Sequence, residues 1–294
     1  NSAGLMQSAL SARICSLPGH PAVPAEITLK QFDHTDEELF LQLAAAENWI
    51  TDRNEFTFLR QHYPQGCLAA KVDGETAAFI TAIRYTNSAW IGNLIVAPHH
   101  RRKGLGRELM QAVLRRLDAD GCSTVWLTAS SDGADLYRRL GFTSIDTIRR
   151  WRICGSLQAP FPDAVDLRYA AALDSIGWGD RRATLFSNVT SGSGWQLMDG
   201  GFLSCLQQEA GLQLGPWGAT SGRVAVELLA KTLEMVSGSG AIFLDVPEKN
   251  PSAARLLQTN GFTANGSTLL MYRGKPPEYR PELVFALASM GSYG

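Results

Sequence analysis

Residues 93–117 read NLIVAPHHRRKGLGRELMQAVLRRL, and the rest of the chain is organised around this stretch. The apolar run 94–96 predicts a β-strand, and Pro98 ends it because proline has no N–H to donate to a strand ladder. A basic turn with two glycines follows at 101–106. Beyond the turn, apolar residues recur at helical spacing and predict an amphipathic helix over 104–118. The residues of its apolar face are Leu105, Leu109, Ala112, Val113 and Leu117.

A strand, a basic glycine turn and a helix together suit the binding of phosphate. The first turn of a helix leaves about four backbone N–H groups unpaired, and the helix dipole adds positive potential there. A pyrophosphate can accept those N–H groups directly, and Gly104 and Gly106 let it approach the backbone closely. Arg101, Arg102 and Lys103 add charge around it. The alternative is a basic helix start on a solvated surface.

Two common phosphate-binding patterns are absent. The Walker pattern needs Gly-Lys-Ser/Thr, and the dinucleotide pattern needs a third glycine where the chain has Leu109. The remaining R-x-x-G-x-G, preceded by the strand and Val-x-Pro, resembles the acetyl-CoA loop of the GNAT superfamily of N-acetyltransferases. The resemblance implies that backbone N–H groups from Arg102 to Arg107 bind the pyrophosphate of acetyl-CoA. The cofactor-binding residues that it implies are Ile95, Val96, Arg101, Arg102, Lys103, Gly104, Leu105, Gly106, Arg107 and Ser130.

Residues 136–142, LYRRLGF, resemble the second acetyl-CoA motif of the family, L-Y-x-x-x-G-F. The resemblance places Tyr137 near the CoA sulfur as the general acid. Proton transfer from a tyrosine with a pKa near 10 to a thiolate with a pKa near 8.5 costs only about 2 kcal/mol. Core packing is the alternative, because Tyr137 stands at helical spacing from Ala134 and Leu140.

The family's fourth strand diverges from its neighbour, and the freed backbone pairs with pantetheine. By resemblance these groups belong to Ile95 and Val96, whose N–H groups also steady the acetyl carbonyl as charge develops. The side chains of both residues are expected to be buried. Family members often carry an Asn before the Tyr helix, but this chain has SSDG at 130–133. Ser130 is the candidate to substitute for it, and Asn250 stands in the other half of the chain.

The acceptor amine must lose a proton before it attacks, because a free alkylammonium has a pKa of about 10. Three carboxylates on the segment that borders the acceptor by family analogy are candidate bases: Glu47, Asp52 and Glu55. Each is alternatively a solvated surface carboxylate. Trp49 either lines the acceptor pocket or belongs to the core. His99 and His100 flank the phosphate turn and are expected in a solvated turn.

The order of predicted elements in the first half favours an α+β fold. A hairpin signal at Asp73-Gly74 and a turn at 87–88 join three antiparallel strands that lead into the phosphate turn. The predicted strands cover 27–32, 67–72, 75–85, 90–96, 124–128 and 142–151, and the predicted helices cover 36–46, 104–118 and 135–140.

The second half loosely repeats the first with a period near 120 residues, which indicates duplicated domains. Helices are predicted at 223–236 and 250–259 around a strand at 241–246, and Gly261-Phe262 mirrors Gly141-Phe142. WGAT at 217–220 stands where the first half has the basic turn, and Leu257 stands at the position of Tyr137.

The chain is therefore expected to form tandem GNAT-like domains, each a mixed, mostly antiparallel sheet flanked by helices. Its expected divisions are a tail (1–25), a catalytic acetyl-CoA-binding domain (26–152), a linker (153–163) and a degenerate GNAT-like domain (164–294).

Composition narrows the function class. With 294 residues, 45% hydrophobic residues and a net charge of −1, a packed protein is expected rather than a general nucleic-acid or membrane-surface binder. The five cysteines are scattered without a C-x-x-C pair, so neither a disulfide framework nor a zinc site is predicted. No apolar run approaches the length of about 20 residues that a membrane span needs. A cytoplasmic protein without a metal is expected.

The predicted function is N-acetyl transfer from acetyl-CoA to an amine by direct transfer in a ternary complex. The acceptor is a small-molecule or peptide amine, and the protein is a monomer or homodimer. The alternative is a non-catalytic acyl-CoA-binding or regulatory module.

Overall fold

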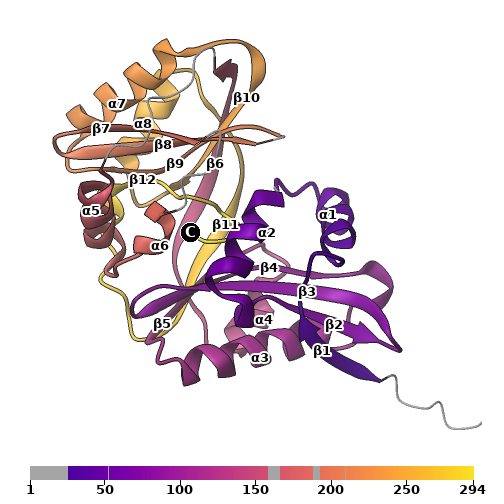
Figure 1. Cartoon of the computed structure of the whole chain (residues 1–294). Coiled ribbons are helices and arrows are strands. Elements are labelled where there is room, and N and C mark those ends of the chain that lie inside the picture. The colour runs from indigo at the N-terminus through magenta and orange to yellow at the C-terminus, as the bar shows by residue number, and fades with distance from the viewer. Residues whose placement is uncertain (1–25, 52, 158–165, 188–192, 209) are drawn as a thin grey trace, which may run out of the picture.

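The computed structural model describes residues 26–51, 53–157, 166–187, 193–208 and 210–294. The predicted tail, Asp52 and residues 158–163 of the predicted linker lie outside these ranges. Within them, the strands form one 12-stranded sheet that runs through both halves of the chain (Figure 1). Its order is β1-β2-β3-β4-β5-β11-β6-β10-β9-β8-β7, with β12 paired to β9. None of the helices in the described ranges is long and apolar enough to cross a membrane.

The first half contains the strands and helices predicted from its sequence. In chain order the elements are β1 (Ile27–Gln31), α1 (Glu37–Ala46), α2 (Arg53–His62), η1 (Pro64–Gly66), β2 (Leu68–Val72), β3 (Glu75–Arg84), β4 (Ser88–Val96), η2 (Pro98–His100), α3 (Leu105–Ala119), β5 (Thr124–Ala129), α4 (Ala134–Arg139) and β6 (Thr143–Leu157). The β2–β3 turn has positive φ at Asp73 (51°) and Gly74 (88°), the conformation that a two-residue hairpin needs.

Helices cover both faces of the first half of the sheet (Figure 1). On one face, α3 buries the predicted apolar stripe, including Leu105, Leu109 and Val113, against β2, β3 and β4. On the other face, α1 and α2 pack through a cluster of phenylalanines, in which the rings of Phe40 and Phe56 lie 4.5 Å apart. The two faces therefore have separate cores, and β4 contributes to both.

The second half repeats the arrangement. Its elements are α5 (Arg168–Trp178), α6 (Ala183–Ser187), β7 (Ser193–Met198), β8 (Gly201–Gln208), β9 (Gly211–Ala219), α7 (Gly222–Glu234), β10 (Val236–Pro247), α8 (Pro251–Thr259), β11 (Thr263–Gly274), η3 (Pro281–Leu283) and β12 (Val284–Ala286). Here β9, α7, β10 and α8 stand where β4, α3, β5 and α4 stand in the first half. Both strand pairs, β4–β5 and β9–β10, are parallel in an otherwise antiparallel sheet.

The two halves exchange their last long strands. β11 of the second half pairs with β5 of the first, and β6 of the first half pairs with β10 of the second. β6 and β11 also pair with each other, which makes the sheet continuous. β6 runs to Leu157, so residues 153–157, predicted to be linker, form a strand instead. The turn-forming residues Gly155 and Ser156 suggested a linker, but Ser156 pairs with Ser237 of β10, and Gly155 lies at the irregularity between this pair and the Cys154–Ala241 pair.

The connections before α3 and α7 differ in length. Residues 97–104 connect β4 to α3, whereas only residues 220–221 connect β9 to α7. The predicted alignment of WGAT (217–220) with the basic turn is therefore wrong. Trp217, Gly218 and Ala219 are the end of β9, and the phosphate turn has no counterpart in the second half.

A buried ion pair joins the exchanged strands. The Arg150 guanidinium on β6 donates two hydrogen bonds, of 2.7 and 2.8 Å, to the fully buried carboxylate of Asp245 on β10. Arg149 and Glu248 form a second pair nearby, but both side chains are about 40% exposed. Removing one partner of the buried pair should therefore cost more free energy of unfolding than removing one partner of the exposed pair, because it leaves a buried charge uncompensated.

We expect Asp245→Asn to lower the free energy of unfolding by about 3 kcal/mol, because it leaves a guanidinium without its buried partner. Glu248→Gln is the matched control on the same pair of strands, with an expected cost below about 1 kcal/mol. Urea unfolding followed by circular dichroism and tryptophan fluorescence measures both. The two probes should report one transition, because the exchanged strands couple the halves. Equal costs for the two variants would contradict this account of the interface.

Candidate functional site

β4 separates from β5 part-way along its length. The two strands pair in parallel only where Ser88–Trp90 faces Thr124–Trp126. A β-bulge follows on β4, where Asn93 has a φ of 55° and two residues face one residue of β3. Among the described residues, the part of β4 from Ile91 to Val96 has no strand partner on its β5 side. Its backbone groups on that side are therefore available to another partner.

The start of α3 lies beside this open part of β4. Gly104 is the N-cap residue with a φ of 89°, and no side chain hydrogen-bonds to the cap. A Cβ added to Gly106 would lie 3.8 Å from the side chains of both Val96 and Leu136. The structure thus brings together the phosphate turn, the open end of β4 and the helix that carries Tyr137.

The cationic side chains in and next to the turn differ in their contacts. Arg101 folds back to donate to the carbonyl oxygen of Val96 at 3.0 Å, and it also pairs with Glu47. Arg102, Lys103 and Arg107 are exposed. The turn therefore keeps three solvent-facing cations around the start of α3, and Arg101 mainly holds the turn against β4.

Tyr137 lies half-buried on α4, in the core cluster that α3 also joins. Its ring contacts Phe142 at a centroid distance of 6.0 Å. Burial raises the pKa of its hydroxyl to about 12, so the hydroxyl keeps its proton at neutral pH. Ser130, predicted to contact the cofactor, accepts a hydrogen bond from the Gly133 N–H at 3.2 Å and so shapes the turn before α4.

Two of the candidate bases are described, and their surroundings differ. Glu47 pairs with Arg101 and is 38% exposed. Glu55 on α2 is buried, and its Oε1 accepts a 2.8 Å hydrogen bond from Nδ2 of Asn93 at the bulge. Trp49 is 40% exposed, which does not support a core position, and His99 is exposed as predicted for a solvated turn.

A segment near the end of the chain reaches the same place, and sequence reasoning missed it. The Asn93 N–H donates to the Gly291 carbonyl oxygen at 3.1 Å, and the Thr128 hydroxyl donates to the Met290 carbonyl oxygen. A Cβ on Gly92 would lie 2.0 Å from the Gly291 oxygen, so glycine is required there. The ring of Tyr293 packs on Phe58 of α2 at 5.5 Å, and Figure 1 places this end of the chain beside α2. In the sequence, the signal for this contact is one glycine in each segment. These are Gly92 in GN (92–93) and Gly291 in MGSY (290–293).

The matching places of the second half are filled by its own chain. Ser221 caps α7 by accepting a hydrogen bond from the Val224 N–H, and Leu257 is fully buried. Asn250 accepts from the Ala253 N–H at 3.1 Å and donates to the Val284 carbonyl at 3.0 Å. The Asn250 side chain is therefore a helix cap tied to β12.

The separation of β9 from β10 is also filled. Their parallel pairing is confined to two positions, Ile242–Leu212 and Phe243–Gln213. β12 pairs with β9, and the Leu287 N–H that follows it donates to the Asp245 carbonyl of β10 at 2.8 Å. In the second half, β12 and Leu287 therefore connect β9 to β10. In the first half, no strand lies between the corresponding parts of β4 and β5 among the described residues.

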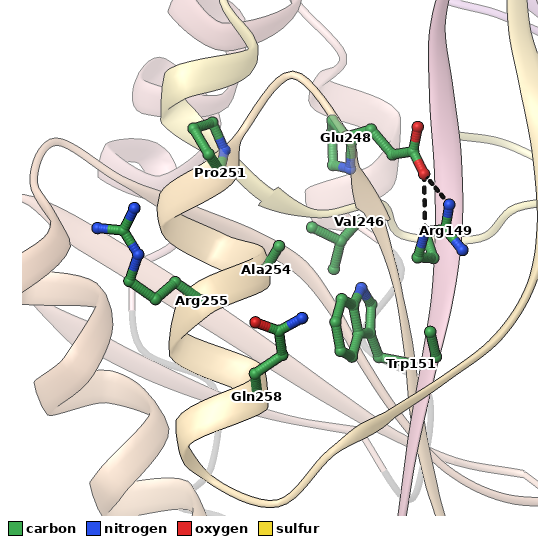
Figure 2. A pocket seen from close by; sticks show the side chains of 10 residues that line it. Arg149, Trp151, Val246, Glu248, Pro251, Ala254, Arg255 and Gln258 are labelled. Atoms are coloured by element: carbon green, nitrogen blue, oxygen red, sulfur yellow. Dashed lines mark hydrogen bonds and ion pairs between the residues drawn. The ribbon is translucent and has the colours of Figure 1, made fainter.

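A hollow of about 530 Å³ lies elsewhere in the second half, between α8 and β6 (Figure 2). Trp151 lines it from β6, while Ala254 and Gln258 face it from α8. Its one carboxylate, Glu248, is paired with Arg149 at the edge. None of its ten lining residues offers a tyrosine, histidine or thiol, so the proton donor of the predicted reaction is not there.

Comparisons with known proteins agree with the geometry of both halves. Residues 27–142 match the family model described as Acetyltransferase (GNAT) family, and residues 170–286 match the model described as Acetyltransferase (GNAT) domain. The first range contains the phosphate turn and Tyr137, and the second contains α7 and α8, with Leu257 at the position of Tyr137.

Relatives carry acyltransferase names. The chain is 26% identical over 264 residues to holothin acyltransferase of Pseudoalteromonas sp. (strain SANK 73390), covering 84% of this chain and 88% of the relative. It is also 26% identical over 225 residues to the uncharacterized N-acetyltransferase YitH of Bacillus subtilis (strain 168), covering 70% and 77%. The [ribosomal protein bS18]-alanine N-acetyltransferase of Escherichia coli (strain K12) is 36% identical over 81 residues, 26% of this chain and 54% of that enzyme.

A solved structure shares the whole architecture. An acetyltransferase crystal structure from Pyrococcus horikoshii superposes with a TM-score of 0.78 at 22% identity, covering 91% of this chain and 96% of that chain. This similarity extends through both halves and supports the fold. The two ranges that match GNAT models together cover most of the chain. The chain therefore belongs to the GNAT family of acetyltransferases.

Proposed function

We propose that the chain is an N-acetyltransferase that moves the acetyl group of acetyl-CoA to a primary amine by direct transfer, in its first half. One observation carries the proposal. An uncapped helix start, a strand edge without a strand partner and a half-buried tyrosine lie together there, whereas in the second half the helix start is capped, the strands are bridged and Leu257 replaces the tyrosine. The names of the relatives support the reaction class.

The residues present fit acetyl-CoA. The backbone N–H groups between Arg102 and Arg107 would take the pyrophosphate, since no side chain caps them. The exposed cations Arg102, Lys103 and Arg107 add attraction for the phosphates. Arg101 already occupies the Val96 carbonyl, so the remaining open-edge backbone groups at Ile95 and Val96 would pair with the pantetheine amides and steady the acetyl carbonyl. Ser130 would remain at the edge of this site, with its hydroxyl already engaged to Gly133.

Tyr137 would protonate the departing thiolate. Its raised pKa, near 12, keeps the proton on the hydroxyl at neutral pH but makes its transfer to a thiolate costlier, about 5 kcal/mol against a thiol pKa near 8.5. A water-poor site raises the pKa of the departing thiol as well, which narrows that gap. The chemistry that acetyl-CoA supplies is an activated thioester; the chain supplies binding, orientation and the proton.

The state of the thiols supports direct transfer rather than an acyl-enzyme. Burial raises the pKa of Cys67 to about 12 and raises the pKa values of Cys122 and Cys205 as well. A thiol acts as a nucleophile through its thiolate, and these three thiols stay protonated at neutral pH. The fourth described cysteine, Cys154, is exposed, but it lies on β6 where that strand pairs with Ala241 of β10 in the second half. The amine itself would then attack the thioester.

The second half would support the first and wall its acceptor face. Asp180, which follows α5, accepts hydrogen bonds from the backbone N–H groups of Asn87 and Ser88 at the turn into β4. Arg182 pairs with Asp174 in the core between the halves, and both side chains are 3% exposed. These contacts fix the turn that starts β4 and so fix where β4 departs from β5.

We expect the purified protein to release free CoA thiol from acetyl-CoA when it is offered a panel of small amines, amino acids, aminoglycosides and peptides. A thiol-reactive dye measures the release, and mass spectrometry of the acceptor confirms one added acetyl group. If acetyl-CoA raises the melting temperature but no amine releases thiol, the chain is an acyl-CoA-binding module and the proposal fails.

Tyr137→Phe should lower kcat about 100-fold while the Kd for acetyl-CoA stays unchanged, because it removes only the proton donor. The protonated hydroxyl is the active form, and a pKa near 12 keeps it protonated throughout the neutral range. The loss should therefore be the same at every pH from about 7 to 10. Tyr169→Phe on α5 is the matched control and should leave kcat unchanged. A Tyr137→Phe enzyme with full activity would reassign the acid.

Gly106→Ala should weaken acetyl-CoA binding at least about tenfold, or about 1.4 kcal/mol. The added methyl meets Leu136 and Val96 at ordinary contact distance, so the protein should fold, but the methyl fills the path beside the helix start. Gly222→Ala at the start of α7 is the control, because nothing lies within 4 Å of its Cβ. Isothermal titration calorimetry measures both. Unchanged affinity for Gly106→Ala would remove the turn from the binding site.

A further inference from the structure

The open part of β4 has two faces, and each carries different chemistry. Leu94 and Val96 pack toward α3 and Tyr137, in the core cluster on the cofactor side. On the opposite face, below α1 and α2, a buried polar group forms around the bulge. It consists of Glu55 on α2, Asn93 on β4 and Thr81 on β3. An amine that reaches the thioester from the side away from Tyr137 meets this group.

Asn93 holds the polar group in place. Its Nδ2 donates to Glu55 Oε1 at 2.8 Å and to Thr81 Oγ1 at 3.1 Å, so both of its amide hydrogens are used. Its backbone N–H donates to the Gly291 carbonyl at 3.1 Å. Its φ of 55° lies in the left-handed region, which asparagine tolerates better than most residues. The bulge thus aims the Asn93 side chain at α2 and its backbone at residues 290–291.

The segment 289–293 closes the inner end of the β4–β5 separation. The Met290 carbonyl accepts from Thr128 on β5, and the Gly291 carbonyl accepts from Asn93 on β4, so the segment bridges both strands. Tyr293 anchors it by accepting a hydrogen bond at its carbonyl from the Tyr85 hydroxyl. The acyl end of a cofactor that enters from the α3 side is therefore stopped at the level of Asn93, next to the Glu55 carboxylate.

From this placement we infer that Glu55 takes the proton of the acceptor ammonium, that Asn93 positions the Glu55 carboxylate, and that the carbonyls of Met290 and Gly291 help to bind the ammonium. The inference rests on the proposed N-acetyltransferase function and identifies the general base of that reaction. Glu47 is excluded from the role because it pairs with Arg101 at the phosphate turn. Glu55 is 6% exposed, and burial disfavours its charged form, but an ammonium beside it would favour the ionised carboxylate. The ligand class is therefore a primary ammonium.

The transfer step balances with these groups and solvent: after transfer, solvent takes the Glu55 proton and returns one to the Tyr137 phenolate, so the net reaction releases one proton. The ammonium gives one proton to the Glu55 carboxylate, and the free amine nitrogen forms a bond to the thioester carbonyl carbon. The carbon–sulfur bond then breaks, and the sulfur leaves with its electron pair and receives the Tyr137 proton. The second proton of the attacking nitrogen passes to solvent as the amide forms. Products are the N-acetylated amine and CoA thiol.

The test compares Glu55→Gln with the wild-type enzyme across pH, using an amine that the wild type acetylates. Glu55→Gln should lower kcat about 100-fold at pH 7, with an unchanged Kd for acetyl-CoA. The deficit should shrink as the pH nears the amine's own pKa of about 10, because solution then supplies free amine. A purely structural role would lower kcat by a factor that does not depend on pH. Glu38→Gln on α1, which lies in the exposed pair with Arg53, is the matched control and should match the wild type.

A second variant tests the positioning role. Asn93→Gly keeps the left-handed backbone but removes the amide that aims Glu55, so it should raise the KM for the amine and lower kcat, with the KM for acetyl-CoA unchanged. Melting temperatures near the wild-type value for both variants establish that they fold. Full activity of Glu55→Gln at pH 7, or a loss that stays constant up to pH 10, would overturn the inference. Wild-type protein that acetylates no amine would instead overturn the proposed function itself.

Discussion

The backbone of β4 beyond Trp90 is the constraint on which the rest of the site depends. A strand inside a sheet needs partners on both edges, and here one edge loses its partner when β4 departs from β5. The chain satisfies the inner end of that edge, where the Asn93 N–H donates to the Gly291 carbonyl, and at the outer end Arg101 donates to the Val96 carbonyl. The outer end, toward Ile95 and Val96, opens directly onto the uncapped start of α3. A ligand with amide groups and a diphosphate would pair with the open strand edge through its amides and bind the start of α3 through its diphosphate.

In the second half, the chain itself supplies partners for the corresponding helix start and strand edge. Ser221 caps α7, Asn250 caps α8, and β12 bridges β9 and β10. The clearest contrast is at the helix starts, because Ser221 caps α7 whereas no side chain caps α3. The second half nevertheless serves the first, because β11 supplies the neighbour strand of β5 and residues 289–293 close the inner end of the separation. On the proposed function, the first half holds the open site and the second half supplies contacts that border it.

Much of this was predictable from the sequence, for a physical reason. Periodicity and glycine placement are local properties, so the strands and helices of the first half, the phosphate turn and the Tyr137 helix could all be recognised along the chain. The strand exchange could not be predicted. The sequences of β6 and β11 are those of ordinary last strands, and a strand's own sequence does not indicate whether it pairs within its half or with the other half. The role of Asn93 was hidden for a similar reason. It depends on a carboxylate 38 residues earlier and on carbonyls near the other end of the chain.

The most direct test of this account is a crystal structure of the protein with CoA bound. We predict the diphosphate on the backbone N–H groups of residues 102–107, the pantetheine along Ile95 and Val96, and the sulfur beside the Tyr137 hydroxyl. CoA bound in the second half, or a diphosphate held away from the start of α3 by side chains alone, would contradict the account.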